Sequence, residues 1–182
     1  MRHKMIHRIA SVGALALAVS ICGIGYAQSA GQASSADKTF VKNAIEGGNA
    51  EVELGQMAMN RGSSQDVKQF GKKMVDDHTQ LGEQMKTVAG QIGVTPPKAI
   101  PAMAKAVELK LKALSGDDFD QAYIKAMVKD HQQDLSDFQK EAGNGTSSVV
   151  KDAATQGSQV ISAHLQMIQQ IAQAHNVQVA EK

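Results

Sequence analysis

The sequence predicts an all-α protein: a bundle of four long helices with an additional short helix between the second and third. Apolar residues recur at steps of three and four over long stretches, which places them on one face of a helix. Clusters rich in Gly, Ser, Pro or Asn separate these stretches at 62–64, 93–97, 115–116 and 143–145. No stretch after residue 27 shows the two-residue alternation of apolar and polar side chains that is typical of a β-strand.

The first 27 residues have the pattern of a secretory signal peptide. Arg2, Lys4 and Arg8 precede an apolar run at 9–24, whose length of about 16 residues is short for a membrane span of roughly 20. Small residues at the end of the run, up to Ala27, suit cleavage by signal peptidase. We therefore predict cleavage after Ala27, export to the periplasm or cell envelope, and no membrane span in the mature chain. The alternative is a retained membrane anchor.

Cleavage would change the charge of the chain and remove its single cysteine. Three of the 19 Lys and Arg residues lie in the leader, whereas all 18 Asp and Glu residues follow it, so the mature net charge is −2. Binding to nucleic acid needs a basic face, so we expect no nucleic-acid partner. An exported chain without cysteine forms no disulfide, and its stability must come from a core or a bound metal. Nothing in the sequence indicates an oligomeric state.

The chain after the leader divides into a flexible linker at 28–36, a helical domain at 37–175 and a tail at 176–182. Ser, Ala, Gly and Gln dominate the linker, and Asp37 is expected to cap the first helix. The expected helices cover residues 37–61, 64–92, 101–114, 117–142 and 146–175. The segment 93–116 is long enough to run from one end of the bundle to the other, which favours a crossover connection over an up-down-up-down order.

The apolar positions define the side of each helix that should face the core. The residues expected to be buried are Phe70, Met74, Leu81, Tyr123, Met127, Phe138, Val160 and Ile171. The first helix also contains Gly47, Gly48 and Gly55, each of which costs roughly 1 kcal/mol relative to Ala in a helix interior. Such glycines indicate a close approach or a kink near a feature that needs room. The alternative is a weak helix that frays.

Two stretches share one pattern and place a histidine on the apolar side of a helix. In both, an aromatic residue, a methionine and a histidine stand four residues apart: Phe70-Met74-His78 and Tyr123-Met127-His131. Glu51 and His164 lie on the apolar stripes of the first and last helices. Counted from the expected caps, the four polar residues lie about 14 to 17 positions into four different helices, so packed helices would bring them to one level.

Glu51, His78, His131 and His164 therefore predict a metal site at mid-bundle. Three imidazoles and one carboxylate are suitable ligands for Zn, Cu or Fe. The alternative is a metal-free buried network in which the histidines are hydrogen-bonded core residues. Asp77 and Asp130 precede two of these histidines and could orient a neighbouring imidazole, although carboxylates on the solvent face are the simpler interpretation. The methionines one turn away are interpreted as core fillers rather than copper ligands.

Other signals are weak or absent. His175, near the end of the chain, is expected to be exposed. The sequence contains no Glu-x-x-His pair of the kind found in di-iron bundles, and no nucleophile elbow, P-loop or dinucleotide fingerprint. No catalytic residue is therefore predicted.

Several short motifs resemble the DUF4142 family of exported bacterial proteins. They are Gly47-Gly48-x-x-Glu51-Val52-x-Leu54-Gly55, Val67-Lys68-x-Phe70, Met74-Val75-x-Asp77-His78, Phe119-Asp120-x-x-Tyr123, Met127-Val128-x-Asp130-His131 and His164-Leu165, within 37–172. The resemblance implies a ferritin-like helical fold and a location in the periplasm or envelope, and it implies no particular activity.

Three functions fit these observations. The first is an exported ferritin-like bundle that binds a transition metal and protects the envelope from stress. The second is a metal-free structural or partner-binding bundle. The third is a metal-dependent oxidoreductase or hydrolase, which requires an open coordination position and a path to it.

Overall fold

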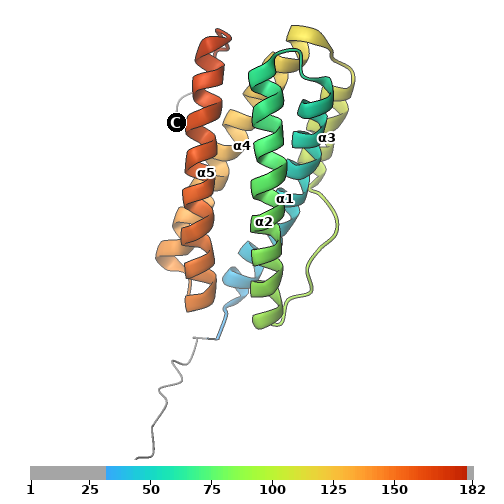
Figure 1. Ribbon diagram of the computed structural model, residues 1–182. Coiled ribbons are helices and arrows are strands. Elements are labelled where there is room, and N and C mark those ends of the chain that lie inside the picture. Colours follow the sequence, from blue (N-terminus) through green and yellow to red (C-terminus); the bar gives the residue numbers. More distant parts are fainter. Residues whose placement is uncertain (1–31, 180–182) are drawn as a thin grey trace, which may run out of the picture.

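The computed structural model describes residues 32–179, which form five α-helices (Figure 1). These are α1 (Ser35–Arg61), α2 (Gln65–Gln91), α3 (Ala102–Lys112), α4 (Gly116–Asn144) and α5 (Ser148–Ala174). No strand occurs between residues 32 and 179, so the predicted all-α class is confirmed. The predicted signal peptide lies outside the described residues, as do the start of the linker and the end of the tail.

Hydrogen bonds at the two ends of the bundle define the direction of each helix. The start of α1 meets the turn between α4 and α5, where the backbone N–H of Thr146 donates to Asp37. The start of α2 meets the start of α4, where Asp120 accepts from the backbone N–H of Ser63. Helices α2 and α4 therefore run in the same direction. The segment that connects them in the chain, which contains α3, runs back along the outside of the bundle (Figure 1). The predicted crossover is present.

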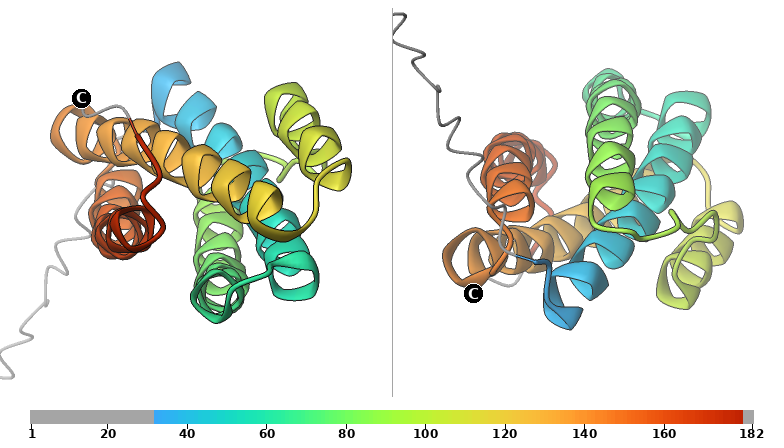
Figure 2. Two further views of the ribbon diagram at one scale, coloured as in Figure 1. Left: turned by 90° about the horizontal axis from the view of Figure 1, so that it is seen from above. Right: turned by 90° about the horizontal axis from the view of Figure 1, so that it is seen from below.

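The four long helices form two antiparallel hairpins, α1 with α2 and α4 with α5. The hairpins meet through contacts of α2 with α5 and of α1 with α4, while α3 lies outside the bundle against α1 and α4 (Figure 2). Two apolar clusters fill the interior. One contains Phe70 and Phe119, towards the α1–α2 connection, and the other contains Val41 and Val150, towards the α4–α5 turn. A layer of polar side chains separates these clusters.

The predicted buried faces are largely correct. Of the eight residues expected in the core, all except Val160 are buried. Val160 is half-buried because α5 turns Ile161 inward instead, and the buried positions on that helix include Gly157. A Cβ atom on Gly157 would lie 2.3 Å from Cε1 of Phe138, so the ring occupies the space that a side chain would fill. A glycine has no apolar side chain, so it does not contribute to an apolar pattern in a sequence. The buried face of α5 was therefore predicted one residue away from its true position.

The first helix begins earlier than predicted. Ser34 is the N-cap, and the backbone N–H of Asp37 donates to the Ser34 hydroxyl while Asp37 accepts from the backbone N–H of Ser34. This is a capping box, so Asp37 occupies its third helical position rather than the cap. Asp37 also accepts hydrogen bonds from the α4–α5 turn, which ties the first helix to the second hairpin.

Helices α1 and α2 cross closely at Gly55 and Gly71. A Cβ atom on Gly55 would lie 2.8 Å from the carbonyl oxygen of Gly71, and one on Gly71 would lie 2.7 Å from the carbonyl oxygen of Gly55. Only glycine allows two backbones to approach this closely. The expectation of a close approach is therefore correct for Gly55, whereas Gly47 and Gly48 have a different environment, described below.

Candidate metal site

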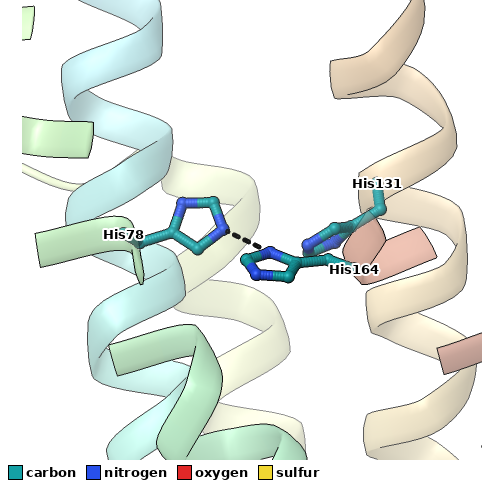
Figure 3. A group of neighbouring side chains, drawn as sticks. All are labelled: His78, His131 and His164. Carbon is teal, nitrogen blue, oxygen red and sulfur yellow. Dashed lines mark hydrogen bonds between the residues drawn. The ribbon is translucent and has the colours of Figure 1, made fainter. Parts of the chain in front are cut away.

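The polar layer contains the four residues that the sequence predicts to be metal ligands. Glu51 comes from α1, His78 from α2, His131 from α4 and His164 from α5, and each has at most 2% of its surface exposed. The three imidazole rings point toward one another (Figure 3). One nitrogen from each ring lies within 4.8 Å of the other two, so the rings could share one small ion.

Each ring has one nitrogen bonded to an acceptor outside the cluster of rings. Nδ1 of His78 lies 2.9 Å from Oε2 of Glu51. Nε2 of His164 lies 2.8 Å from Oδ2 of Asp77. Nδ1 of His131 lies 3.1 Å from the backbone carbonyl of Met127, one turn earlier on α4. Metal-binding histidines commonly donate their second N–H to a carboxylate or carbonyl in this way.

The remaining nitrogens face inward. Nε2 of His78 lies 3.2 Å from Nδ1 of His164 (Figure 3). Nε2 of His131 lies 3.6 Å from Oε1 of Glu51, too far for a hydrogen bond. Among the described residues, neither of these two buried atoms has a hydrogen-bond partner. Buried polar atoms without partners are uncommon and call for an explanation.

Counting protons indicates why the inner atoms lack partners. A neutral imidazole carries one N–H, and a carbonyl oxygen can only accept, so neutral His131 has its hydrogen on Nδ1 and a lone pair on Nε2. If Glu51 and Asp77 are ionised, they likewise take the N–H groups of His78 and His164. Three lone pairs then converge without a proton between them, which a cation would relieve.

A metal-free arrangement satisfies only part of the cluster. A proton on Glu51 would allow a chain in which Glu51 donates to His78, His78 donates to His164, and His164 donates to Asp77. Even then, Nε2 of His131 faces the 3.6 Å gap without a donor. The metal-free network therefore leaves a buried acceptor unsatisfied, at a cost of roughly 1–3 kcal/mol.

The distances suit a transition metal. Two nitrogens bound to one tetrahedral ion at about 2.0–2.1 Å stand roughly 3.3 Å apart. The observed separation of 3.2 Å between the facing nitrogens of His78 and His164 is close to this value. Glu51 can hold His78 through Oε2 and still offer Oε1 to an ion. The residues present fit the group that the sequence predicts.

Burial sets the protonation of the cluster. It lowers the pKa of His78 and of His164 to about 4. Burial, with the neighbouring imidazoles, also lowers the pKa of His131 well below its usual range. The three rings are thus neutral at neutral pH, which is the form that binds metal. Burial and the nearby charge of Asp130 raise the pKa of Glu51 well above its usual range, so an incoming cation would displace its proton.

The two aspartates beside the repeated histidines have different positions. Asp77 is half-buried and accepts from His164 and from Lys73, whose Nζ lies 2.7 Å away. Burial alone would raise the pKa of Asp77, but these hydrogen bonds outweigh it and hold the pKa below its usual range. Asp130 is exposed, and together with Glu51 and His131 it forms a second group of potential ligands. Asp77 therefore orients an imidazole on another helix, the interpretation that the sequence favoured less.

Other features differ from the prediction or were missed. His175 is half-buried rather than exposed, with Nε2 at 2.9 Å from Asp66. This pair connects the end of α5 to the start of α2, a contact that depends on tertiary structure. The carbonyl of Met127 was missed because a backbone acceptor leaves no mark in a sequence. The only available signal is its place four residues before His131, which a helix brings within reach.

Comparison with known proteins agrees with this fold. The model of the DUF4142 family, a domain of unknown function, matches residues 25–171. The chain belongs to this family. A search of curated proteins found no match.

Solved structures resemble the DUF4142 bundle at low sequence identity. A DUF305 protein of Streptomyces coelicolor, described as predicted to be secreted, has a TM-score of 0.68 at 14% identity, covering 81% of this chain and 98% of that one. CopM in its Cu(I)-bound form has a TM-score of 0.63 at 16% identity, covering 76% and 96%. A two-domain protein of Anabaena variabilis with a ferritin-like domain has a TM-score of 0.59 at 14% identity, covering 82% and 40%.

These likenesses establish the ferritin-like fold of the DUF4142 domain. They do not extend to ligands at such identities. Within 32–179, no helix is both long enough and apolar enough to cross a bilayer.

Proposed function

We propose that this DUF4142 protein binds one transition metal ion at mid-bundle, through the imidazoles of His78, His131 and His164 and through Oε1 of Glu51. The observation that carries the proposal is a pair of buried atoms that have no hydrogen-bond partner within residues 32–179, Nε2 of His131 and Oε1 of Glu51. They lie in the same buried layer as two facing nitrogens, Nε2 of His78 and Nδ1 of His164. The opposite nitrogens of these two rings contact Glu51 and Asp77. A cation bound between the three rings would take up the inward nitrogens, and Glu51, which groups with His131, would be its fourth ligand.

The donor set favours copper or zinc among the three candidate ions. Imidazole nitrogens suit Zn, Cu and Fe, and the affinity of such a site for divalent ions increases toward copper. One carboxylate among three imidazoles offers iron fewer oxygen ligands than a di-iron site provides. The fold likeness to CopM, which is described in a Cu(I)-bound form, supports including copper in any test.

Export of the protein fits a role in metal handling outside the cytoplasm. The leader pattern at 1–27 and the description of the Streptomyces coelicolor structure support a periplasmic or envelope location. A buried site with oriented ligands suits holding an ion, and we propose that sequestration of the ion protects the envelope from metal stress.

The experiment is a metal measurement on the mature chain, produced without a histidine tag. The protein is freed of metal with a chelator, incubated with zinc or copper, passed through a desalting column and analysed for bound metal by mass spectrometry. We expect one ion per chain and a raised melting temperature, since a ligand that binds only the folded state stabilises it. His131→Ala should lose both effects.

His175→Ala is the matched control, because this half-buried histidine lies outside the cluster and pairs with Asp66. It should bind metal as the wild type does. If the wild type and His131→Ala retain the same amount of metal and show the same melting shift, the proposed site is wrong. The histidines would then form a metal-free network.

A further inference from the structure

A cavity of about 510 Å³ reaches the buried cluster from the side of α1 and α4. Its walls include Glu51 and His78, two members of the cluster. At roughly 30 Å³ per water molecule, an ion with six waters would occupy about 180 Å³, so a hydrated ion fits inside. The buried site is therefore next to a space that can hold its ligand with the hydration shell intact.

Two consecutive glycines form part of the wall of this cavity. Gly47 and Gly48 lie inside α1, one turn before Glu51. A Cβ atom at either position would meet nothing within 4 Å in the described part of the chain. Packing therefore does not require glycine there, in contrast to Gly55, although each glycine costs helix stability. Their effect is to leave open space beside Glu51.

The cavity wall is also acidic. Asp134, Asp137 and Glu141 from α4 line it together with Glu51, against a single lysine, Lys140. A carboxylate in a cleft attracts cations. Burial raises the pKa of Asp134 to about 9 and, with the neighbouring Asp37, raises that of Glu141 to about 7, so we assign the attraction at neutral pH to the exposed Asp137. Glu51, whose buried Oε1 has no hydrogen-bond partner among the described residues, belongs both to this wall and to the cluster.

We propose that this cavity is the route by which a hydrated divalent cation reaches the buried site. The carboxylate of Asp137 attracts the ion, the gap left by Gly47 and Gly48 admits it, and Glu51 and His78 are the first ligands it meets. The other histidines lie deeper, so the ion loses its waters as it passes from Glu51 toward His131 and His164. This inference rests on the proposed metal site and adds the residues that control uptake.

The first test blocks the gap. Metal-free wild type and Gly48→Leu are mixed with zinc in a stopped-flow instrument, and free zinc is followed with a chromophoric indicator. Gly48→Leu should take up zinc at least ten-fold more slowly, with the final stoichiometry unchanged. Gly90→Leu is the matched control, because Gly90 is exposed on α2, has room for a Cβ atom with no described atom within 4 Å, and does not line the cavity. It should match the wild type.

The second test removes the charge. Asp137→Asn should slow uptake about three-fold at low salt and reduce the dependence of the rate on ionic strength. Asp152→Asn, at an exposed aspartate on α5, is the control. If the wild type takes up zinc and all variants match its rate, the access route is wrong while the metal site stands. If the wild type takes up neither zinc nor copper, the proposed function itself fails.

Discussion

The close crossing of α1 and α2 predicts that a single methyl group will weaken both the fold and the site. In Gly71→Ala, the new Cβ would lie 2.7 Å from the carbonyl oxygen of Gly55, 2.8 Å from Cβ of Ala58 and 3.0 Å from the backbone nitrogen of Met59. Ordinary contacts begin at 3.4 Å. Two of these three atoms belong to the backbone and cannot turn away, so the helices must separate by about 0.7 Å or strain locally.

The expected cost follows from two opposing effects. Overpacking in a tight interior costs typically 1–3 kcal/mol, and the immobile backbone atoms place this site near the upper end. Ala is better than Gly in a helix by roughly 1 kcal/mol, so the net loss should be about 2 kcal/mol. Gly90→Ala is the control, because its Cβ meets no described neighbour and only the helix preference remains. It should gain up to about 1 kcal/mol.

The assay is urea unfolding of the metal-free proteins, which compares free energies of unfolding at equal slope. The substitution should also weaken metal binding, since Glu51 lies one turn before Gly55 and its 2.9 Å contact to His78 spans the two helices. If Gly71→Ala is as stable as Gly90→Ala, the helices do not cross as closely as described. The alignment of Glu51 with His78 would then need another explanation.

Three further predictions concern the core and the site. Phe70 contacts Tyr123 and two histidine rings in the interior, and Phe70→Ala should cost about 3–5 kcal/mol in urea unfolding; a loss below about 1 kcal/mol would contradict its placement. Asp77→Asn should lower the affinity for zinc or copper about 10–100-fold in a competition titration, because an amide orients the His164 imidazole less well than a carboxylate. An unchanged affinity would show that Asp77 does not orient His164. Burial lowers the pKa of His164 to about 4 from an unfolded value of roughly 6.5, so acid below about pH 6.5 protonates the unfolded chain first and destabilises the metal-free fold. The raised pKa of Glu51 acts in the opposite direction, so the wild type must be compared with a variant that lacks His164. Between pH 7 and 5, His164→Asn should lose about 2 kcal/mol less of its free energy of unfolding than the wild type. Equal pH dependence of the two proteins would show that His164 is not buried as a neutral ring.

The fold was predictable because the apolar pattern is regular. Alternating steps of three and four from Val67 to Val88 predict the buried side of α2, and the residues at these positions are buried in the structure. The face of α5 was misassigned by one residue, because Gly157 and Ala154 contribute to a buried face without large side chains. The helix start at Ser35 was missed for a different reason: Asp37 was interpreted as the cap, whereas Ser34 is the cap and Asp37 completes a capping box with it.

The composition of the cluster was predictable, but its chemistry was not. Equal depth in four helices brings Glu51 and the three histidines together, and periodicity alone shows this. The assignment of each N–H depends on acceptors that lie on other elements or on the backbone, such as Asp77 opposite His164 and the carbonyl of Met127. These relations are set by helix rotation at a scale of ångströms, which a sequence pattern does not contain.

The division of the cluster between the two hairpins has a mechanical consequence. Glu51 and His78 belong to the α1–α2 hairpin, whereas His131 and His164 belong to the α4–α5 hairpin. Packing is extensive inside each hairpin and less extensive between the hairpins. Within residues 32–179, the segment that contains α3 is the only covalent link between the two hairpins. An ion held by all four side chains would connect the two hairpins and stabilise the interface between them. Its removal should weaken the interface between the hairpins while each hairpin remains folded. The rate of amide hydrogen exchange should then increase on the inward faces of all four long helices together.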